Sequence, residues 1–578
     1  MLTFRQYLVI IALCFYIHYD VKSKDIITFD SVEQNSIYSR KKKREIIFKH
    51  VYFNNKNQKG GKKGPLGPKQ FNYIEYNYQN KNFTYTFSWL KRPGENMFFY
   101  KQNKLFYITN SYNGYLSINC NSILRYILVG DYTLGSGQGL IFNNVWTMYT
   151  ISDPIKIFKI QRGIKGCKNH YQNKIKGIAV EIKLKQNITL IPFCGCNALD
   201  ANNHKSYVSS VFRRDAYINK KKLMQRNSLL EKIYGCIVSL NDKKDNYEFG
   251  FNFVKTKFSV PLKLADTRQL GYIFSGNRNI NLGMFARFLF GPIHFFYEQS
   301  GCYAPRAKTP KGKAMIIGCI INTFKFLDIA LCYRFYSKNY YNFYGKSMCN
   351  HNGGNCSNLK GAGRNEKGIY LACILYPSDN MSIACNMDLF YNDKSFNYLE
   401  RNGRNIALCL KYTFPNTQNN ISITCKNTNK KHKVKSRNSF NQDQDYIYTK
   451  INSTYKVKDN ITLQSQLHFC SIYFSKIDFG IYGALGYKTT KYNIEMFLGI
   501  VNNKYNKALN IIAKDLIRQN LLYIKKPCIK IGIKIRNMIA LFYTIKYSLL
   551  VIYTHNFKEQ NKLQRNNMCF KLLIMFKD

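Results

Sequence analysis

The sequence predicts an all-β protein that closes into an antiparallel transmembrane β-barrel, with a short disordered arm before the barrel. Segments in which apolar residues stand at every second position recur from about residue 81 to the end of the chain. Polar clusters of turn character separate these segments, and none reaches the ~18 consecutive apolar residues that a membrane helix needs. At about ten residues per strand, the length allows roughly 14 to 22 strands.

Period-two alternation is the main evidence for strands that have one apolar and one polar face. It is clearest in residues 178–185, 247–253, 381–389, 406–414, 461–469 and 529–536. The final segment carries Phe570 and Phe576, and outer-membrane barrels commonly close with an aromatic strand of this kind. Closure would remove the edges that so many strands otherwise expose. Soluble β-sandwich domains alternate in the same way, so periodicity alone leaves them open.

The N-terminus predicts export. Arg5 precedes an apolar run over residues 7–17, and Val21-Lys22-Ser23 offers a cleavage site, as in a signal peptide over residues 1–23. Residues 24–80 are polar and basic, with charged runs at 40–44 and 59–65, which predicts a flexible arm. Residues 81–578 are then the barrel, and we expect it in the outer membrane of a bacterial cell.

The chain is strongly basic, with 87 Lys and Arg against 32 Asp and Glu and a formal net charge of +55. The charge is spread along the whole chain, so it indicates non-specific attraction to phosphates and no specific nucleic-acid partner. The 18 cysteines are scattered, with at most a few loop pairs such as Cys349 and Cys356 placed to bridge. Neither a CxxC pair nor a His cluster completes a metal site, so we expect no metal and no cofactor.

Glycines at 130, 135, 137 and 139 invite comparison with a phosphate-binding loop. The segment lacks the Lys-Ser/Thr of a P-loop and lies among strands, so bends or close packing are the better interpretation. We expect Asp131 and Gln138 to pair with backbone at the bend. Glu366, with Arg364 and Lys367, fits either a pore constriction or a turn with a local ion pair. No catalytic triad, HExxH motif or nucleophile elbow occurs, so we expect no enzymatic activity.

The segment 128–142, which reads LVGDYTLGSGQGLIF, resembles the GDY…GQGL block of an outer-membrane barrel family widespread in Bacteroidota. Members of that family are often described as helix-hairpin-helix or competence-like proteins. Similar blocks follow in order at 175–179, 190–193, 199–202, 274–277, 333–336, 344–345 and 365–371. The resemblance implies family-motif positions, structural or facing the lumen, at Gly130, Asp131, Tyr132, Gly137, Gln138, Gly139, Asp200, Arg334, Asn365, Glu366, Gly368 and Tyr370.

The resemblance has two limits. Family members usually carry helix-hairpin-helix repeats before the barrel, and residues 24–80 are too short and irregular to hold them. A DNA-related role therefore does not carry over. Beyond about residue 415 the match is less clear, and the barrel is extended there on alternation alone.

The sequence thus predicts an integral outer-membrane β-barrel that is a pore or channel, or an accessory of envelope transport, with outer-membrane lipid and envelope transport proteins as partners. Lysines such as Lys183, Lys185 and Lys534 would favour anions in an open lumen. Two alternatives remain: a plugged structural or docking barrel without transport, and a secreted protein of β-domains with disulfides. The cargo is not encoded in any motif that we identify.

Overall fold

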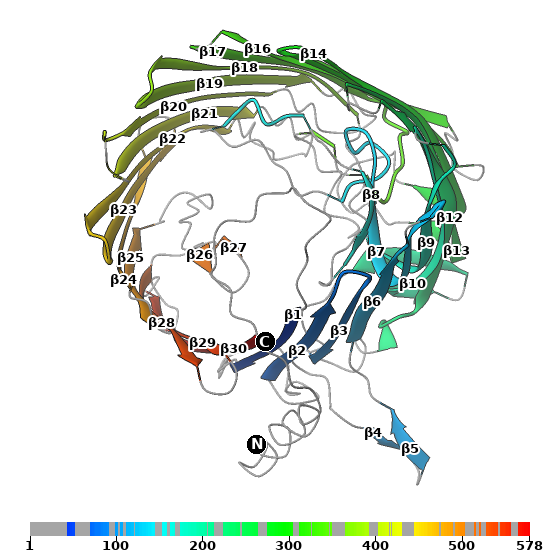
Figure 1. The fold of residues 1–578 in the computed structure, drawn as a ribbon, viewed down its shortest axis with the longest axis horizontal. Helices are drawn as coiled ribbons and strands as arrows, with labels where there is room; N and C mark the ends of the chain where they lie inside the picture. Colours follow the sequence, from blue (N-terminus) through cyan, green and yellow to red (C-terminus); the bar gives the residue numbers. More distant parts are fainter. Residues whose placement is uncertain are drawn as a thin grey trace, which may run out of the picture.

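The alternating segments form strands that pair with their sequence neighbours and close into a ring in the computed structural model (Figure 1). The structure describes residues 43–577, except for segments between strands. These are chiefly 53–69, 92–98, 145–152, 213–223, 264–273, 305–310, 350–364, 392–402, 431–443, 503–513, 522–527 and 557–564, with shorter gaps in other connections. Side chains are described between residues 73 and 500. The expected signal peptide lies outside the described residues.

The ring, which we call the wall, consists of strands whose bounds are as follows. They are β1 (Lys43–Tyr52), β2 (Gln70–Gln79), β3 (Phe83–Lys91), β6 (Ser111–Asn119), β7 (Leu124–Gly135), β9 (Ile175–Lys183), β10 (Ile188–His204), β12 (Leu229–Asn241), β13 (Tyr247–Lys263), β14 (Ser275–Phe290), β15 (Ile293–Tyr303), β16 (Lys311–Phe324), β17 (Leu327–Tyr336), β18 (Glu366–Ser378), β19 (Met381–Tyr391), β20 (Gly403–Thr413), β21 (Asn420–Lys430), β22 (Gln444–Lys458), β23 (Ile461–Ile472), β24 (Lys476–Lys488), β25 (Tyr492–Asn502), β28 (Cys528–Ala540), β29 (Thr544–Asn556) and β30 (Arg565–Lys577).

Short strands lie beside the wall strands in sequence. β8 (Gly163–Gly166) pairs with the end of β7, and β11 (Tyr207–Phe212) pairs with the end of β10. Two small hairpins are β4 (Phe99–Lys101) with β5 (Lys104–Tyr107), and β26 (Lys514–Asp515) with β27 (Asn520–Leu521).

The ring closes where the first wall strand meets the last. β1 pairs antiparallel with β2 and also with β30, where Phe48 lies opposite Ile574. Every backbone edge is thereby paired, as a membrane-spanning sheet requires. The prediction of an all-β, closed antiparallel barrel is confirmed.

The wall starts earlier than the sequence pattern indicated. The described part of the sheet has 26 strands, and 24 of them form the ring once β8 and β11 are set aside. β1 and β2 fall inside residues 24–80, for which we expected a flexible arm. With them the ring has 24 strands, which is two more than the upper end of the expected range of roughly 14 to 22. In β2 the inward face carries buried Glu75 and Asn77, so an apolar face does not mark this strand in the sequence.

The two faces of the wall differ as a transmembrane barrel requires. Large apolar side chains point outward and stay exposed, for example Phe251 at 63% and Leu282 at 58%, while polar residues such as Arg334 and Glu298 point inward and are buried. In water an apolar surface of this extent would be a liability, whereas in lipid it is the expected band. No helix in the described part of the chain is long and apolar enough to cross a membrane.

The two rims of the barrel carry connections of different length. At one rim, neighbouring strands are joined by connections such as 291–292, 379–380 and 459–460, and we call it the short-connection rim. At the opposite, long-connection rim, the chain runs through 304–310, 337–365 and 392–402. A difference in connection length between the two rims is typical of membrane β-barrels.

Parts of several connections appear within the ring in Figure 1, among them the β26–β27 hairpin and two segments with buried side chains. Residues 136–144, which we call the first inner segment, place Leu140, Ile141 and Phe142 in a buried cluster against the wall. Residues 337–345, the second inner segment, add Tyr340 and Tyr344 to the same cluster. The main apolar core of the protein is therefore between these segments and the wall.

Candidate functional site

The glycine-rich motif of β7 leads into the first inner segment, where its glycines form a binding pocket for a carboxylate. Gly137 and Gly139 have φ of 51° and 88°, in the left-handed region that favours glycine. The intervening backbone turns two amides toward Glu298, a fully buried residue of β15. The N–H of Gln138 donates to Glu298 Oε2 at 2.6 Å, and that of Leu140 donates at 3.1 Å. This is an anion nest, and the anion is the protein's own carboxylate.

The space around this nest is filled closely. A Cβ added at Gly137 would lie 2.8 Å from Glu298 Oε2 and 2.9 Å from Phe285 Cβ. Ile141 projects from the segment toward Gly283 on the inner face of β14, where an added Cβ would lie 2.7 Å from Ile141 Cδ1. The glycines thus serve close packing of an inner segment on the wall, as the sequence predicted for this motif.

The second inner segment is bonded to the first. Tyr340 donates its hydroxyl to the carbonyl oxygen of Leu140 at 3.1 Å and lies 3.0 Å from Ser300 Oγ on β15. Asn342 donates its side-chain amide to the carbonyl oxygens of Leu140 and Ile141, the latter at 3.0 Å. Buried hydrogen bonds therefore hold the two segments to each other and to the wall. The residues bonded to Leu140 lie 200 and 202 positions after it in the sequence.

The GDY residues hold the wall together before the chain turns inward. Gly130 has φ of 115°, and an added Cβ would lie 2.3 Å from the carbonyl oxygen of Gly114, so β6 and β7 approach closely there. Asp131 is fully buried, accepts the N–H of Gly114 at 2.9 Å and lies 3.0 Å from Lys174 Nζ. Burial lowers the pKa of Lys174, and the adjacent Asp131 opposes that shift. Tyr132 places its hydroxyl 2.9 Å from the carbonyl oxygen of Cys194.

The NEKGIYL residues belong to a second buried polar cluster. Arg334 of β17 is fully buried, with Nε 2.6 Å from Glu366 Oε1 on β18 and an Nη 2.8 Å from Asp388 Oδ1 on β19. Gly368 makes room for the guanidinium, because a Cβ there would lie 2.6 Å from Arg334 Cζ. Tyr370 donates its hydroxyl to the carbonyl oxygen of Pro154 at 2.7 Å. Residues 153–158 are thereby attached to this part of the wall.

The remaining predicted positions have local roles. Asn365 immediately precedes β18 with φ of 50°, and its N–H donates to the carbonyl oxygen of Ser337 at 3.3 Å. Asp200, near the end of β10, accepts the N–H of Asn227 at 3.0 Å and stands apart from both clusters. Glu366 pairs across strands with Arg334 rather than with its neighbour Lys367, which points outward, and Arg364 lies outside the described residues.

Sequence reasoning did not single out Glu298, Asp388 or Lys174. Each complements a predicted residue: Glu298 the glycine loop, Asp388 the guanidinium of Arg334, and Lys174 the carboxylate of Asp131. A signal existed for the two acids. Each is the only carboxylate of its strand and stands at an inward position, where a buried charge needs a partner.

The inner face of β20–β23 differs from that of β7–β19. It carries Lys411 and Gln464, which are exposed, and Lys426, Lys450 and Gln466, which are partly exposed, with buried His468 among them. Among the described inward positions of these four strands there is no Asp or Glu. Of the lysines predicted to line the lumen, Lys183 lies at an inward position of β9 and Lys185 in a turn, while the side chain of Lys534 is outside the described set.

The fold and this interior define a class: a large transmembrane β-barrel whose lumen is occupied on one side by its own inner segments. No protein-family model and no curated protein matches the chain. Solved structures of similar fold include the siderophore receptor PirA from Pseudomonas aeruginosa, with TM-score 0.46 and 6% identity over 93% of this chain and 81% of that one.

Two further similarities are to the P pilus usher PapC translocation pore and the copper transporter OprC. The first has TM-score 0.37 and 9% identity, and it covers 93% of this chain and 99% of that one. The second has TM-score 0.43 and 7% identity, and it covers 93% and 80%.

Proposed function

We propose that the protein is a channel of a bacterial outer membrane whose path runs along the inner face of β20–β23 and favours small anions. One observation carries this proposal. The buried carboxylates of the occupied side are matched by protein groups, Glu366 by Arg334 and Asp131 by Lys174, whereas β20 and β22 present Lys411 and Lys450 to the lumen.

The physical basis is the charge left in the path. Fixed lysines along one wall raise the local concentration of anions, and side-chain charges at a pore surface set its selectivity. At physiological salt such charges act over about 8 Å, so lysines on nearby strands act on the same permeating ion. Carboxylates neutralised inside the occupied side contribute little to the field in the path.

The test is ion selectivity in a planar bilayer. We expect the purified barrel, in a salt gradient of potassium chloride, to give a reversal potential of the sign set by chloride. The Lys411→Gln/Lys450→Gln double variant should shift that potential toward zero. The matched control is Lys232→Gln/Lys257→Gln, which removes two exposed lysines from the outer face of β12 and β13 and should leave the potential unchanged. Cation selectivity, or an equal shift in both double variants, would contradict the proposal.

A second candidate is a docking barrel without transport. It is favoured by the bonding of the two inner segments to each other and to Glu298, which gives a rigid filling of one side of the lumen. A folded barrel without conductance in the same bilayer would select this candidate. It would then act through envelope proteins that contact its loops or rims.

The same proposal includes the location of the protein in the outer membrane and its membership of a protein family. An apolar outer band and the predicted signal peptide support the outer membrane, with lipid as the constant partner and envelope transport proteins as further ones. The GDY…GQGL and NEKGIYL segments support membership of the Bacteroidota barrel family in a divergent form. In this proposal the protein has no enzymatic role.

A further inference from the structure

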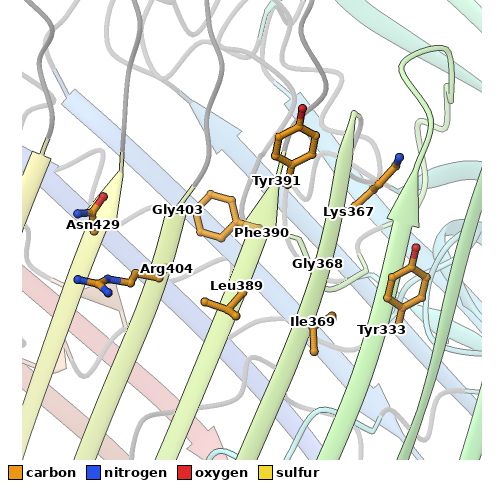
Figure 2. A pocket seen from close by; sticks show the side chains of 10 residues that line it. All are labelled: Tyr333, Lys367, Gly368, Ile369, Leu389, Phe390, Tyr391, Gly403, Arg404 and Asn429. Carbon is orange, nitrogen blue, oxygen red and sulfur yellow. The ribbon is translucent and has the colours of Figure 1, made fainter.

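A groove of about 660 Å³ lies on the outer face of the wall across β17–β21 (Figure 2). It is formed by outward side chains near the ends of these strands, together with Phe390 and two glycines. The lining consists of Tyr333, Lys367, Gly368, Ile369, Leu389, Phe390, Tyr391, Gly403, Arg404 and Asn429. It contains two cationic side chains and no carboxylate.

The groove lies at the long-connection rim. β17 and β19 end at Tyr336 and Tyr391, and β18 and β20 begin at Glu366 and Gly403, so the strand ends around the groove are those joined by 337–365 and 392–402. In an outer membrane this rim belongs to the external leaflet. The groove is separate from the lumen, because Lys367, Leu389 and Arg404 stand on the outward face of their strands.

The lining changes from polar to apolar along the strands. Lys367 and Tyr391 lie at the strand ends, while Ile369 and Leu389 lie further from the rim (Figure 2). Arg404 stands on β20 beside them. Ile369 and Leu389 are 45% and 40% exposed, and Arg404 lies directly opposite Leu389, so an apolar surface continues below Lys367 and beside Arg404. Lys367 and Tyr391, which lie nearer the rim than this apolar surface, match the order of headgroup and acyl chain in a leaflet.

The lysine is held over the outer face by a neighbouring ring. Lys367 Nζ lies 5.8 Å from the centre of the Phe335 ring, which places its charge beside the wall. Arg404 is two strands away on β20, and an arginine fork matches the geometry of a phosphate oxygen pair. The groove between them is therefore electropositive at the level of the headgroups.

We propose that this groove binds a phosphate-bearing lipid of the outer leaflet, with the phosphate between Lys367 and Arg404 and an acyl chain against Ile369 and Leu389. The apolar surface between the two cations is what distinguishes a lipid from free phosphate, since free phosphate gains nothing from it. Each basic side chain at an anionic surface strengthens binding several-fold, so loss of both should weaken it about 10- to 30-fold. The inference rests on the location in an outer membrane and not on conduction.

The experiment uses the full-length protein in neutral detergent micelles and native mass spectrometry. The probe is a diphosphorylated lipid A, compared with the same lipid after removal of its phosphates and with inorganic phosphate as a competitor. We expect the wild type to retain one phosphorylated lipid. The Lys367→Gln/Arg404→Gln double variant should need about 10- to 30-fold more lipid for the same occupancy. The charge-conserving Lys367→Arg/Arg404→Lys variant should restore most of the binding.

The Lys232→Gln/Lys257→Gln variant is the matched control, because these lysines also face outward near the long-connection rim and pair across β12 and β13. It should bind as the wild type does. Equal weakening in both double variants would reduce the effect to general attraction and overturn the site. Full competition by inorganic phosphate, or equal binding of the dephosphorylated lipid, would also overturn it. Because the groove faces away from the lumen, the groove double variant should keep wild-type ion selectivity, so this test and the conductance test fail independently.

Discussion

Replacing Glu298 by Ala should release the first inner segment from the wall. The Glu298 carboxylate accepts two backbone N–H groups, from Gln138 at 2.6 Å and from Leu140 at 3.1 Å, in a fully buried setting. Hydrogen bonds to a charged group contribute about 1.5–3 kcal/mol each, and donors left buried without an acceptor cost more. We therefore expect the segment to lose about 3–5 kcal/mol of stability against local opening.

The Glu298→Gln variant should show a smaller loss of stability of the first inner segment. Its side-chain carbonyl oxygen still accepts one amide hydrogen, but the negative charge is gone and the amide group adds a donor. About half of the loss, roughly 1.5–3 kcal/mol, is expected. A matched control is Glu181→Ala, which removes a carboxylate on β9 that lies 3.9 Å from Arg125 and is not the acceptor of the Gln138 and Leu140 amides.

Hydrogen–deuterium exchange of the detergent-solubilised barrel measures local opening directly, since amide exchange reports the free energy of each opening. Peptides covering residues 136–144 should exchange about 10²- to 10³-fold faster in Glu298→Ala, because 1.4 kcal/mol corresponds to a factor of ten. Peptides from β20–β23 should be unchanged. Wild-type exchange of the 136–144 peptides in the Ala variant would refute the role assigned to the Glu298 carboxylate.

Three further substitutions test the other contacts. Arg334→Met should lower the free energy of unfolding by about 3–5 kcal/mol, measured by urea titration in lipid vesicles, because it leaves two buried carboxylates without their counter-charge. An unchanged midpoint would contradict this. Gly130→Ala should cost about 2–3 kcal/mol, seen as a lower melting temperature, because its φ of 115° is unsuited to alanine and its Cβ would meet the carbonyl oxygen of Gly114 at 2.3 Å. An unchanged melting temperature would show that β6 and β7 can move apart to admit the added Cβ at no cost in stability. Tyr370→Phe removes the bond to the Pro154 carbonyl oxygen and about 1 kcal/mol, so proteolysis near 153–158 should become about 5-fold faster while the barrel midpoint stays. Equal cleavage rates would exclude that attachment.

The sequence itself determined the class of fold. In a membrane, one strand face meets lipid and the other meets the interior, so apolar residues must alternate, and residues such as Phe249 and Phe251 record that alternation directly. The glycine motif also indicated close packing, because glycines at such spacing are retained where backbone and side chains leave no room for a Cβ. These properties are local, and they can be read without knowing any long-range contact.

Only the tertiary structure decided how the interior is organised. Alternation shows that Glu298 and Arg334 face inward, but it does not show what they meet there. Glu298 binds amides 160 residues earlier in the chain, and Arg334 binds an acid 32 residues later. Such pairs depend on strand register, on ring closure and on inner segments that fold back into the lumen.

The sequence pattern did not predict β1 and β2 as wall strands for the same reason. β2 carries Glu75 and Asn77 on its inward face, and these polar groups are stabilised there only once the strand is folded into the wall. Its inclusion follows from pairing: β1 can close the ring against β30 only if β2 joins it to β3. The physical reason is general: a strand face that is polar and buried is stabilised by contacts that its own sequence does not contain.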